Sequence, residues 1–188
     1  MREKIILGIG LGLLILGVQS RLFGPQPVSK TPAIFSPFIQ GLPLDSGSFV
    51  VTRVVDGDTI VVTVPGSTEK VRLIGVDTPE IVDPRKPVQC FGKEASDFTK
   101  TLLNNKSVRL EADPSQDNRD KYGRLLRYVF LGNINVSEKI IAEGYGHEYT
   151  YLLPYKYQTE FKNAEQLARD AKKGLWADGA CGLSNTQK

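Results

Sequence analysis

The sequence is poor in the residues that build structural metal sites and carries little net charge. It has one histidine and two cysteines among 188 residues, which excludes a structural zinc site, because such a site takes four Cys or His ligands. The formal net charge is only +3, so the chain as a whole produces no strong field for polyanions. Any such affinity must come from local basic clusters, for example Lys121, Arg124 and Arg127.

A long apolar run is also missing. The uncharged stretch near the N-terminus, residues 5–18, is shorter than the roughly 20 residues of a membrane-spanning helix. Basic residues precede it, which is the order of a secretory signal. We therefore predict export, with residues 1–23 as either a cleaved signal peptide or a retained anchor that attaches the chain to the membrane through residues 5–23. Residues 24–47 contain five prolines and no regular period, which predicts an extended tether to an outer-face domain.

The two cysteines, Cys90 and Cys181, are an even pair behind this export segment. Parity and compartment favour a disulfide between them, and two free thiols are the alternative if the chain stays in a reducing compartment. A disulfide would close a loop of about ninety residues and contribute a few kcal/mol in the chain-entropy model.

Strand patterns precede helical patterns from residue 48 onward. Residues 49–55, 59–64 and 70–76 are rich in β-branched residues and predict three consecutive antiparallel strands. Two more strands are predicted over residues 107–112 and 124–131. Five short strands with helices interspersed later predict an α+β fold with a small closed barrel.

Three helices are predicted from apolar spacing and caps. One stripe runs from Phe91 to Leu102, and a short helix starts at a capping box on Asn135 and stops at Gly144. The last helix has a stripe of Phe161, Ala164, Ala168 and Ala171, with Gly174 as its C-cap and Trp176 folded back as a core plug. The single histidine, His147, is not assigned as a base.

The chemistry is concentrated in three segments, residues 56–59, 72–80 and 120–124. Attack on a phosphodiester needs cations at the phosphorus and an activated water. Asp58 and Asp77 follow neighbouring strands, so their carboxylates and the Thr78 carbonyl can converge on one hard cation, calcium or magnesium. Asp56 is either turn chemistry or a support for these ligands.

Two arginines and a glutamate supply the remaining groups. Arg72 and Arg124 can each present a planar guanidinium fork to a phosphate, and Glu80 is left to activate water. Period-two alternation would place Arg72 and Asp77 on opposite strand faces, so a bulge or bend is required between them, and we predict it at Gly75.

These segments, in this order, resemble the thermonuclease, or staphylococcal-nuclease-like, family over residues 48–176. Phe91-Gly92-Lys93-Glu94-Ala95 and Ile141-Ala142-Glu143-Gly144 are similar to its helices. The resemblance implies a five-stranded OB-type β-barrel with three α-helices in a domain over residues 48–178, followed by a tail over residues 179–188. It also implies calcium-dependent cleavage of DNA and RNA that leaves 3′-phosphate ends.

The resemblance implies a role for each matching residue. Asp58, Asp77 and Thr78 become calcium ligands, Arg72 and Arg124 the phosphate-stabilising pair, and Glu80 the general base. Lys121 and Tyr122 match positions that hold a terminal phosphate, while Tyr149 and Tyr151 match a tyrosine pair that lines the nucleotide pocket.

Three departures from the best-known family member are visible: a stretch one residue shorter before Tyr149, a glycine at position 75, and the cysteine pair. None removes a catalytic group. The alternatives are a catalytically silent OB-type module that binds nucleic acid or protein, and an envelope interaction domain whose metal site is only structural. We expect a monomer.

Overall fold

The computed structural model describes residues 47–82 and 87–182. The predicted export segment, the tether and the end of the tail lie outside these ranges. Within them, no helix combines the length and apolar character needed to cross a membrane.

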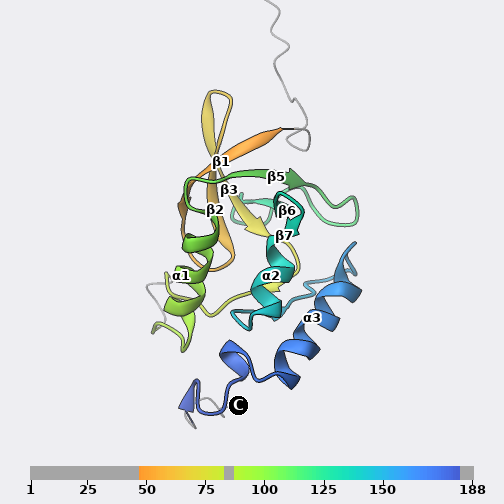
Figure 1. Cartoon of the computed structure of the whole chain (residues 1–188). Helices are drawn as coiled ribbons and strands as arrows, with labels where there is room; N and C mark the ends of the chain where they lie inside the picture. The colour runs from red at the N-terminus through yellow and green to blue at the C-terminus, as the bar shows by residue number, and fades with distance from the viewer. Residues whose placement is uncertain (1–46, 83–86, 183–188) are drawn as a thin grey trace, which may run out of the picture. The chain divides into compact units, whose positions relative to one another are not determined.

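Five strands form a closed barrel: β1 (Ser48–Val54), β2 (Thr59–Val64), β3 (Ser67–Leu73), β5 (Ser107–Glu111) and β6 (Leu125–Leu131). Antiparallel pairs join them in the order β3-β2-β1-β5-β6, and a parallel pairing of β3 with β6 closes the ring. The predicted α+β fold, a five-stranded barrel with three helices, is confirmed (Figure 1).

Apolar residues of all five strands fill the barrel. Side chains from every barrel strand are essentially inaccessible to solvent, among them Val51, Ile60, Val71, Leu110 and Leu125. Removing this apolar surface from water is the main force that stabilises the ring.

The third strand differs from its predicted bounds. It starts at Ser67, directly after a two-residue turn, and ends at Leu73 rather than at residue 76. The chain then turns at Gly75, which has a φ of 79°, and continues as the short strand β4 (Val76–Asp77). This strand pairs with β8 (His147–Glu148) in a separate two-stranded sheet. The bend predicted at Gly75 is therefore present.

Helix α1 (Gly92–Leu103) presents a different face to the core from the predicted stripe. Its buried side includes Ala95, Thr99 and Leu103, whereas Phe98 and Leu102 are only partly buried at the edge of the core. The reason is polar, because the Thr99 hydroxyl donates a 2.8 Å hydrogen bond to the Gly57 carbonyl. The apolar spacing could not show that a threonine belongs to the buried side.

Helices α2 (Val136–Ala142) and α3 (Gln158–Asp170) pack side by side next to the barrel (Figure 1). The Asn135 side chain caps α2 by accepting from the Glu138 amide, and Gly144 follows with a φ of 74°, as predicted. The short strand β7 (Ile134–Asn135) leads into this helix.

The C-cap predicted for α3 is wrong. The cap residue is Ala171, which is exposed rather than part of the buried stripe, and Lys172 takes the left-handed position with a φ of 50°. Gly174 instead begins the 3-10 helix η1 (Gly174–Trp176), where an added Cβ would lie 2.3 Å from the Gly144 carbonyl oxygen. A glycine is thus needed at position 174 because of the close backbone contact with Gly144, and not because α3 ends there.

Trp176 is also not the predicted core plug. It is only partly buried, and the Arg169 guanidinium lies 3.6 Å from its ring centre. The ring therefore packs at the surface against a cation.

A buried carboxylate ties the barrel to the start of α3. Asp113 accepts hydrogen bonds from the Tyr128 hydroxyl at 2.6 Å and from the Lys156 amide at 2.8 Å. Its other oxygen accepts from the Ser115 amide and hydroxyl. Burial alone would raise the pKa of Asp113, but these bonds outweigh it and hold the pKa below its ordinary value of 3.8.

We expect Asp113→Asn to lower the free energy of unfolding by about 2 kcal/mol at pH 7. The NH₂ group of the asparagine would face hydrogen-bond donors where the aspartate has an acceptor oxygen. Since the folded state lowers the pKa of Asp113, its contribution is complete above the ordinary carboxyl pKa and is lost as the pH falls through the folded value. The difference from wild type should therefore narrow below about pH 4. Denaturant titrations at pH 7 and pH 3 measure it, with the exposed Asp117→Asn as the control.

Candidate active site

A polar cavity of about 230 Å³ opens where the β1–β2 turn, the end of β3 and the segment after β4 meet. All six residues predicted to be catalytic or to bind metal line it: Asp58, Arg72, Asp77, Thr78, Glu80 and Arg124. Asp56, Pro79 and Gln89 complete the lining.

Asp58 is the buried centre of this site. It lies in the turn between β1 and β2, and only 3% of its surface is exposed. One carboxylate oxygen accepts from the Thr78 amide at 2.9 Å and from the Thr78 hydroxyl at 3.0 Å. The other accepts from the Thr59 hydroxyl at 3.1 Å and pairs with the Arg72 guanidinium. A buried carboxylate with this many donors is held in one orientation.

The turn that carries Asp58 is fixed from both sides. A Cβ at Gly57 would lie 2.6 Å from the Thr78 hydroxyl oxygen, so no larger residue fits between the turn and Thr78. Asp56 shapes the turn itself, since its carboxylate accepts from the Asp58 amide at 3.2 Å. Burial raises the pKa of Asp56, opposed by its hydrogen bond with Thr59. Asp56 thus has turn chemistry and also lines the cavity.

Arg72 joins the two predicted metal-binding carboxylates. Its guanidinium pairs with Asp58 and donates to Asp77 at 2.7 Å, and it also donates to the Val76 carbonyl at 3.1 Å. These contacts are possible because the chain turns at Gly75 and brings residues 76 and 77 back beside the end of β3.

Arg124 lies directly before β6, not within a strand as predicted. Its Nε donates to Asp120 at 2.7 Å and its Nη1 donates to the Thr59 hydroxyl at 3.2 Å. Asp120 also accepts from the amides of Tyr122 and Arg124. Burial opposes ionisation of Asp120, but its bonds with Arg124 lower its pKa below the ordinary value.

Asp120 and Thr59 orient Arg124, and sequence reasoning gave neither a role. The signal for Asp120 was present, because an aspartate that accepts from amides two and four residues later is typical of a turn. Thr59 carried no such signal, because its hydroxyl meets Arg124 only after the barrel closes.

Glu80 reaches the cavity from the segment after β4. Its carboxylate accepts from the Val82 amide at 2.6 Å. Its backbone is bonded on both sides by Gln89, a residue that the sequence analysis did not single out: the Glu80 amide donates to the Gln89 side chain at 2.8 Å, and the Gln89 amide donates to the Glu80 carbonyl at 2.9 Å.

The four predicted substrate-binding residues lie outside this cavity lining. Tyr122 is 69% exposed, with Lys121 Nζ 5.2 Å and the Arg124 guanidinium carbon 5.5 Å from its ring centre. Tyr149 and Tyr151 are also exposed, and their ring centres are 6.4 Å apart. The structure therefore places Lys121 and Tyr122 next to Arg124 and gives two exposed aromatic surfaces, one on each segment.

His147 is paired with Asp77 in the β4–β8 register. The centre of its ring lies 5.9 Å from that of the Trp176 ring, so the imidazole packs against another side chain of the fold.

The donor set of the cavity fits a hard divalent cation. The side chains of Asp56, Asp58, Asp77 and Glu80 face two guanidinium groups, so carboxylates outnumber the cations of the lining. Asp77 is accessible, with a side chain 44% exposed. No group of three or more His, Cys, Asp or Glu residues suited to a metal occurs within residues 47–82 and 87–182. The predicted ligand set of two carboxylates and one carbonyl is smaller than such a group, and a hard cation on it would take its remaining ligands from water and substrate.

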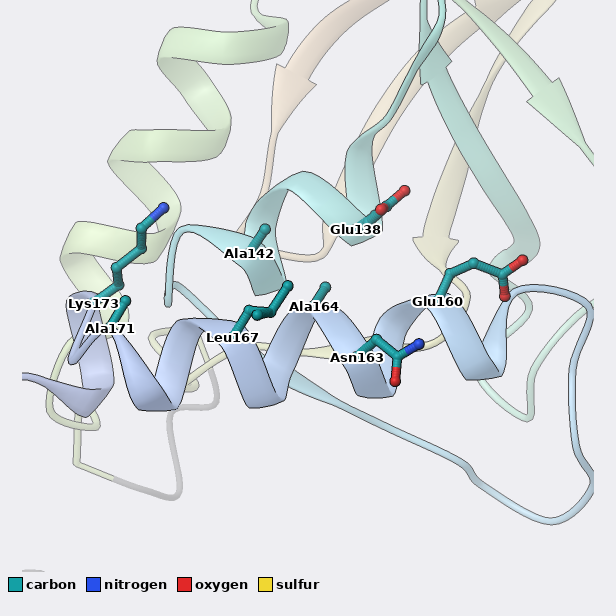
Figure 2. Close-up of a pocket in the computed structure, with 8 residues that line it drawn as sticks. All are labelled: Glu138, Ala142, Glu160, Asn163, Ala164, Leu167, Ala171 and Lys173. Atoms are coloured by element: carbon teal, nitrogen blue, oxygen red, sulfur yellow. The ribbon is translucent and has the colours of Figure 1, made fainter.

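A larger cavity, of about 600 Å³, lies between α2 and α3 (Figure 2). Its lining is mostly alanine, leucine and single charged groups of either sign, and it contains none of the predicted site residues. The smaller cavity is the one with convergent polar chemistry.

Comparison with known proteins agrees with this geometry. The sequence model of the family described as staphylococcal nuclease homologue matches residues 70–178. The chain belongs to that family. The match covers Arg72, Asp77, Glu80 and Arg124 and starts after the turn that carries Asp58.

Named relatives of this family match across a wider range. The chain is 47% identical over 131 residues to the thermonuclease of Staphylococcus hyicus, which covers 70% of this chain and 76% of that protein. It is 46% identical over 129 residues to the thermonuclease of Staphylococcus intermedius, covering 69% and 76%. It is 41% identical over 126 residues to endonuclease YncB of Bacillus subtilis (strain 168), covering 66% and 59%.

Two glycines with the same backbone angle test the Gly75 turn. Gly75 and Gly66 both have a φ of 79°, but a Cβ at Gly75 would lie 2.7 Å from the rings of Phe161 and Tyr155, whereas a Cβ at Gly66 would meet nothing within 4 Å. We expect Gly66→Ala to cost about 1 kcal/mol from backbone strain alone, and Gly75→Ala to cost about 3 kcal/mol because overpacking is added. Urea titrations measure both. Equal costs would show that the ring contacts place no constraint on the turn.

Proposed function

We propose that this phosphodiester-hydrolysing nuclease cleaves both DNA and RNA in a calcium-dependent reaction that leaves 3′-phosphate ends. The observation that carries the proposal is the convergence of two guanidinium groups, two carboxylates and Glu80 on one polar cavity. The names of the thermonuclease relatives support the reaction class.

The two arginines act on the phosphate. The guanidinium groups of Arg72 and Arg124 neutralise the charge that develops on the phosphoryl oxygens in the transition state. Their own carboxylate partners hold them in place before substrate arrives, so little reorganisation is needed during the reaction.

Asp58, Asp77 and the Thr78 carbonyl would hold the calcium ion. When bound, the ion supplies Lewis acidity toward a phosphate oxygen. Asp58 is already fixed by Thr78 and Thr59, so this side of the site is preorganised. Asp77 shares its carboxylate with Arg72, so one residue serves both the metal site and the phosphate site.

Glu80 acts as the general base. Its carboxylate, at the cavity wall, accepts the proton of the attacking water as the water oxygen bonds to phosphorus. The P–O5′ bond breaks, and the leaving 5′-oxygen takes up a proton from solvent, which gives a 3′-phosphate and a 5′-hydroxyl.

Substrate recognition outside the cavity rests on aromatic and basic side chains. Lys121 and Tyr122 receive a terminal phosphate, and Tyr149 and Tyr151 stack on nucleotide bases. Stacking on exposed tyrosines accepts any base, which fits a nuclease with little sequence preference and no discrimination of the sugar.

We further propose that the protein acts as a monomer outside the cytoplasm, either released after signal cleavage or held on the outer face of the membrane through residues 5–23. The Cys90–Cys181 disulfide supports this location, because disulfides persist in oxidising compartments. No observation favours the silent OB-type module, since each proposed catalytic group is present in the cavity.

The full chain should hydrolyse single-stranded DNA, double-stranded DNA and RNA with calcium, and not with a chelator, because the proposed oxygen site holds the cation beside the phosphate. End-group analysis of the products should find 3′-phosphates. The same assays with magnesium in place of calcium are run in parallel. A folded protein that binds nucleic acid but cleaves none in any metal would favour the silent module instead.

Replacing the Arg124 fork by a point charge should lower kcat about 100-fold or more, in the range seen when one preorganised donor is lost. Arg124→Lys keeps the charge but loses the second donor direction. Arg53→Lys is the matched control, because Arg53 is exposed on the same barrel. Steady-state kinetics with calcium give the comparison, and circular dichroism checks the fold. Wild-type kcat in Arg124→Lys would remove Arg124 from the mechanism.

A further inference from the structure

Gln89 holds the backbone of Glu80 through two hydrogen bonds of opposite direction. Its side-chain oxygen accepts from the Glu80 amide at 2.8 Å, and its own amide donates to the Glu80 carbonyl at 2.9 Å. Both polar groups of the Glu80 backbone are therefore bonded to one residue nine positions later. Gln89 also lines the catalytic cavity together with Glu80.

The start of α1 packs directly on this pair. The Gln89 carbonyl accepts from the Gly92 amide at 3.0 Å, which attaches Gln89 to the first residue of the helix. A Cβ at Gly92 would lie 2.5 Å from Ile81 and 3.0 Å from the Pro79 carbonyl oxygen. The helix start and the Glu80 segment are thus in close contact, with no room for a side chain between them.

The Cys90–Cys181 disulfide joins the next residue to the C-terminal part of the chain. The two Cα atoms are 5.6 Å apart, which confirms the predicted pairing. The region before Cys181 is anchored in turn, because the Ala180 amide donates to Ala177, and the Leu175 amide donates to the Gly144 carbonyl at 2.8 Å. The disulfide thus links the Glu80 segment to a C-terminal segment that is itself bonded to Gly144, just after α2.

We propose that Gln89 is a positioning residue for Glu80 and that the Cys90–Cys181 disulfide keeps Gln89 in place. This inference rests on the proposed function, because it assigns a role in the same reaction. It goes beyond it by naming the groups that fix the position of the general base.

Gln89 preorganises the Glu80 segment before substrate binds. Gln89 is exposed, so water competes for its hydrogen bonds, and a restraint next to Gln89 favours keeping both of them. The disulfide supplies that restraint one residue away. Displacement of a catalytic group by about 1 Å can cost on the order of 100-fold in rate, so a looser Glu80 backbone lowers kcat while substrate binding, which uses other residues, is retained.

The test compares three variants of the full chain in the calcium-dependent assay. Gln89→Met keeps the side-chain length but removes the acceptor, and we expect kcat to fall about tenfold with KM within about twofold. Gln89→Glu restores an acceptor for the Glu80 amide and should recover most of the loss. Gln166→Met, on the exposed side of α3, is the matched control and should have wild-type kinetics.

A double-mutant comparison tests the disulfide. The double variant Cys90→Ala/Cys181→Ala should have a lower kcat, with a smaller change in KM. Adding Gln89→Met to this double variant should lower kcat less than Gln89→Met does in the disulfide-bonded protein, because the disulfide and Gln89 act on the same segment. Reduction of the wild type by a dithiol, which becomes a cyclic disulfide as the two protein thiols form, should reproduce the loss. All assays are run where circular dichroism shows each protein folded.

The outcomes distinguish failure of the positioning role from failure of the proposed function. An active wild type with unchanged kcat in Gln89→Met, or equal losses in Gln89→Met and Gln89→Glu, would overturn the positioning role alone. A strictly additive effect in the cysteine-free background would overturn the role of the disulfide. A folded wild type that cleaves nothing would overturn the proposed function and this inference with it.

Discussion

The guanidinium group of Arg72 pairs with both Asp58 and Asp77, and the organisation of the site depends on this contact. Asp58 is buried, and a buried carboxylate without a cation or several donors would be strongly destabilising. In the β2–β3 register, Arg72 lies opposite Thr59. Thr59 directly follows Asp58 in the chain, so the guanidinium reaches the Asp58 carboxylate. The turn at Gly75 then returns Asp77 to the same guanidinium, so one arginine fixes the relative position of two carboxylates.

Closure of the barrel extends this contact into a network. The parallel pairing of β3 with β6 matches Arg72 with Leu126, which brings the start of β6 beside the β1–β2 turn. There the Thr59 hydroxyl donates to Asp58 and accepts from Arg124. Through Asp58, which pairs with Arg72, this hydroxyl connects the two arginines proposed to stabilise the phosphate.

Much of this arrangement could be predicted, and the failures have identifiable causes. The β-branched runs predicted the barrel strands, and the alternation conflict between Arg72 and Asp77 correctly required a bend at Gly75. The buried side of α1 shares Ala95 with the predicted stripe but is shifted from it, and it includes Thr99, which donates a hydrogen bond to a distant carbonyl. The cap assigned to Gly174 was wrong because its glycine serves a contact with Gly144, which local sequence does not reveal.

The sequence by itself determined the chemical inventory, the approximate positions of the barrel strands along the chain and the bend at Gly75, because residue type, period and backbone freedom are local properties. It also indicated the cysteine pairing, through parity and compartment. Only the tertiary structure decided that the Thr59 hydroxyl contacts Arg124 and that Gln89 bonds the backbone of Glu80. These contacts join segments through barrel closure and through the packing of α1 on the Glu80 segment, and the hydrogen-bonding partner of a polar side chain is set by that geometry rather than by its neighbours in the chain.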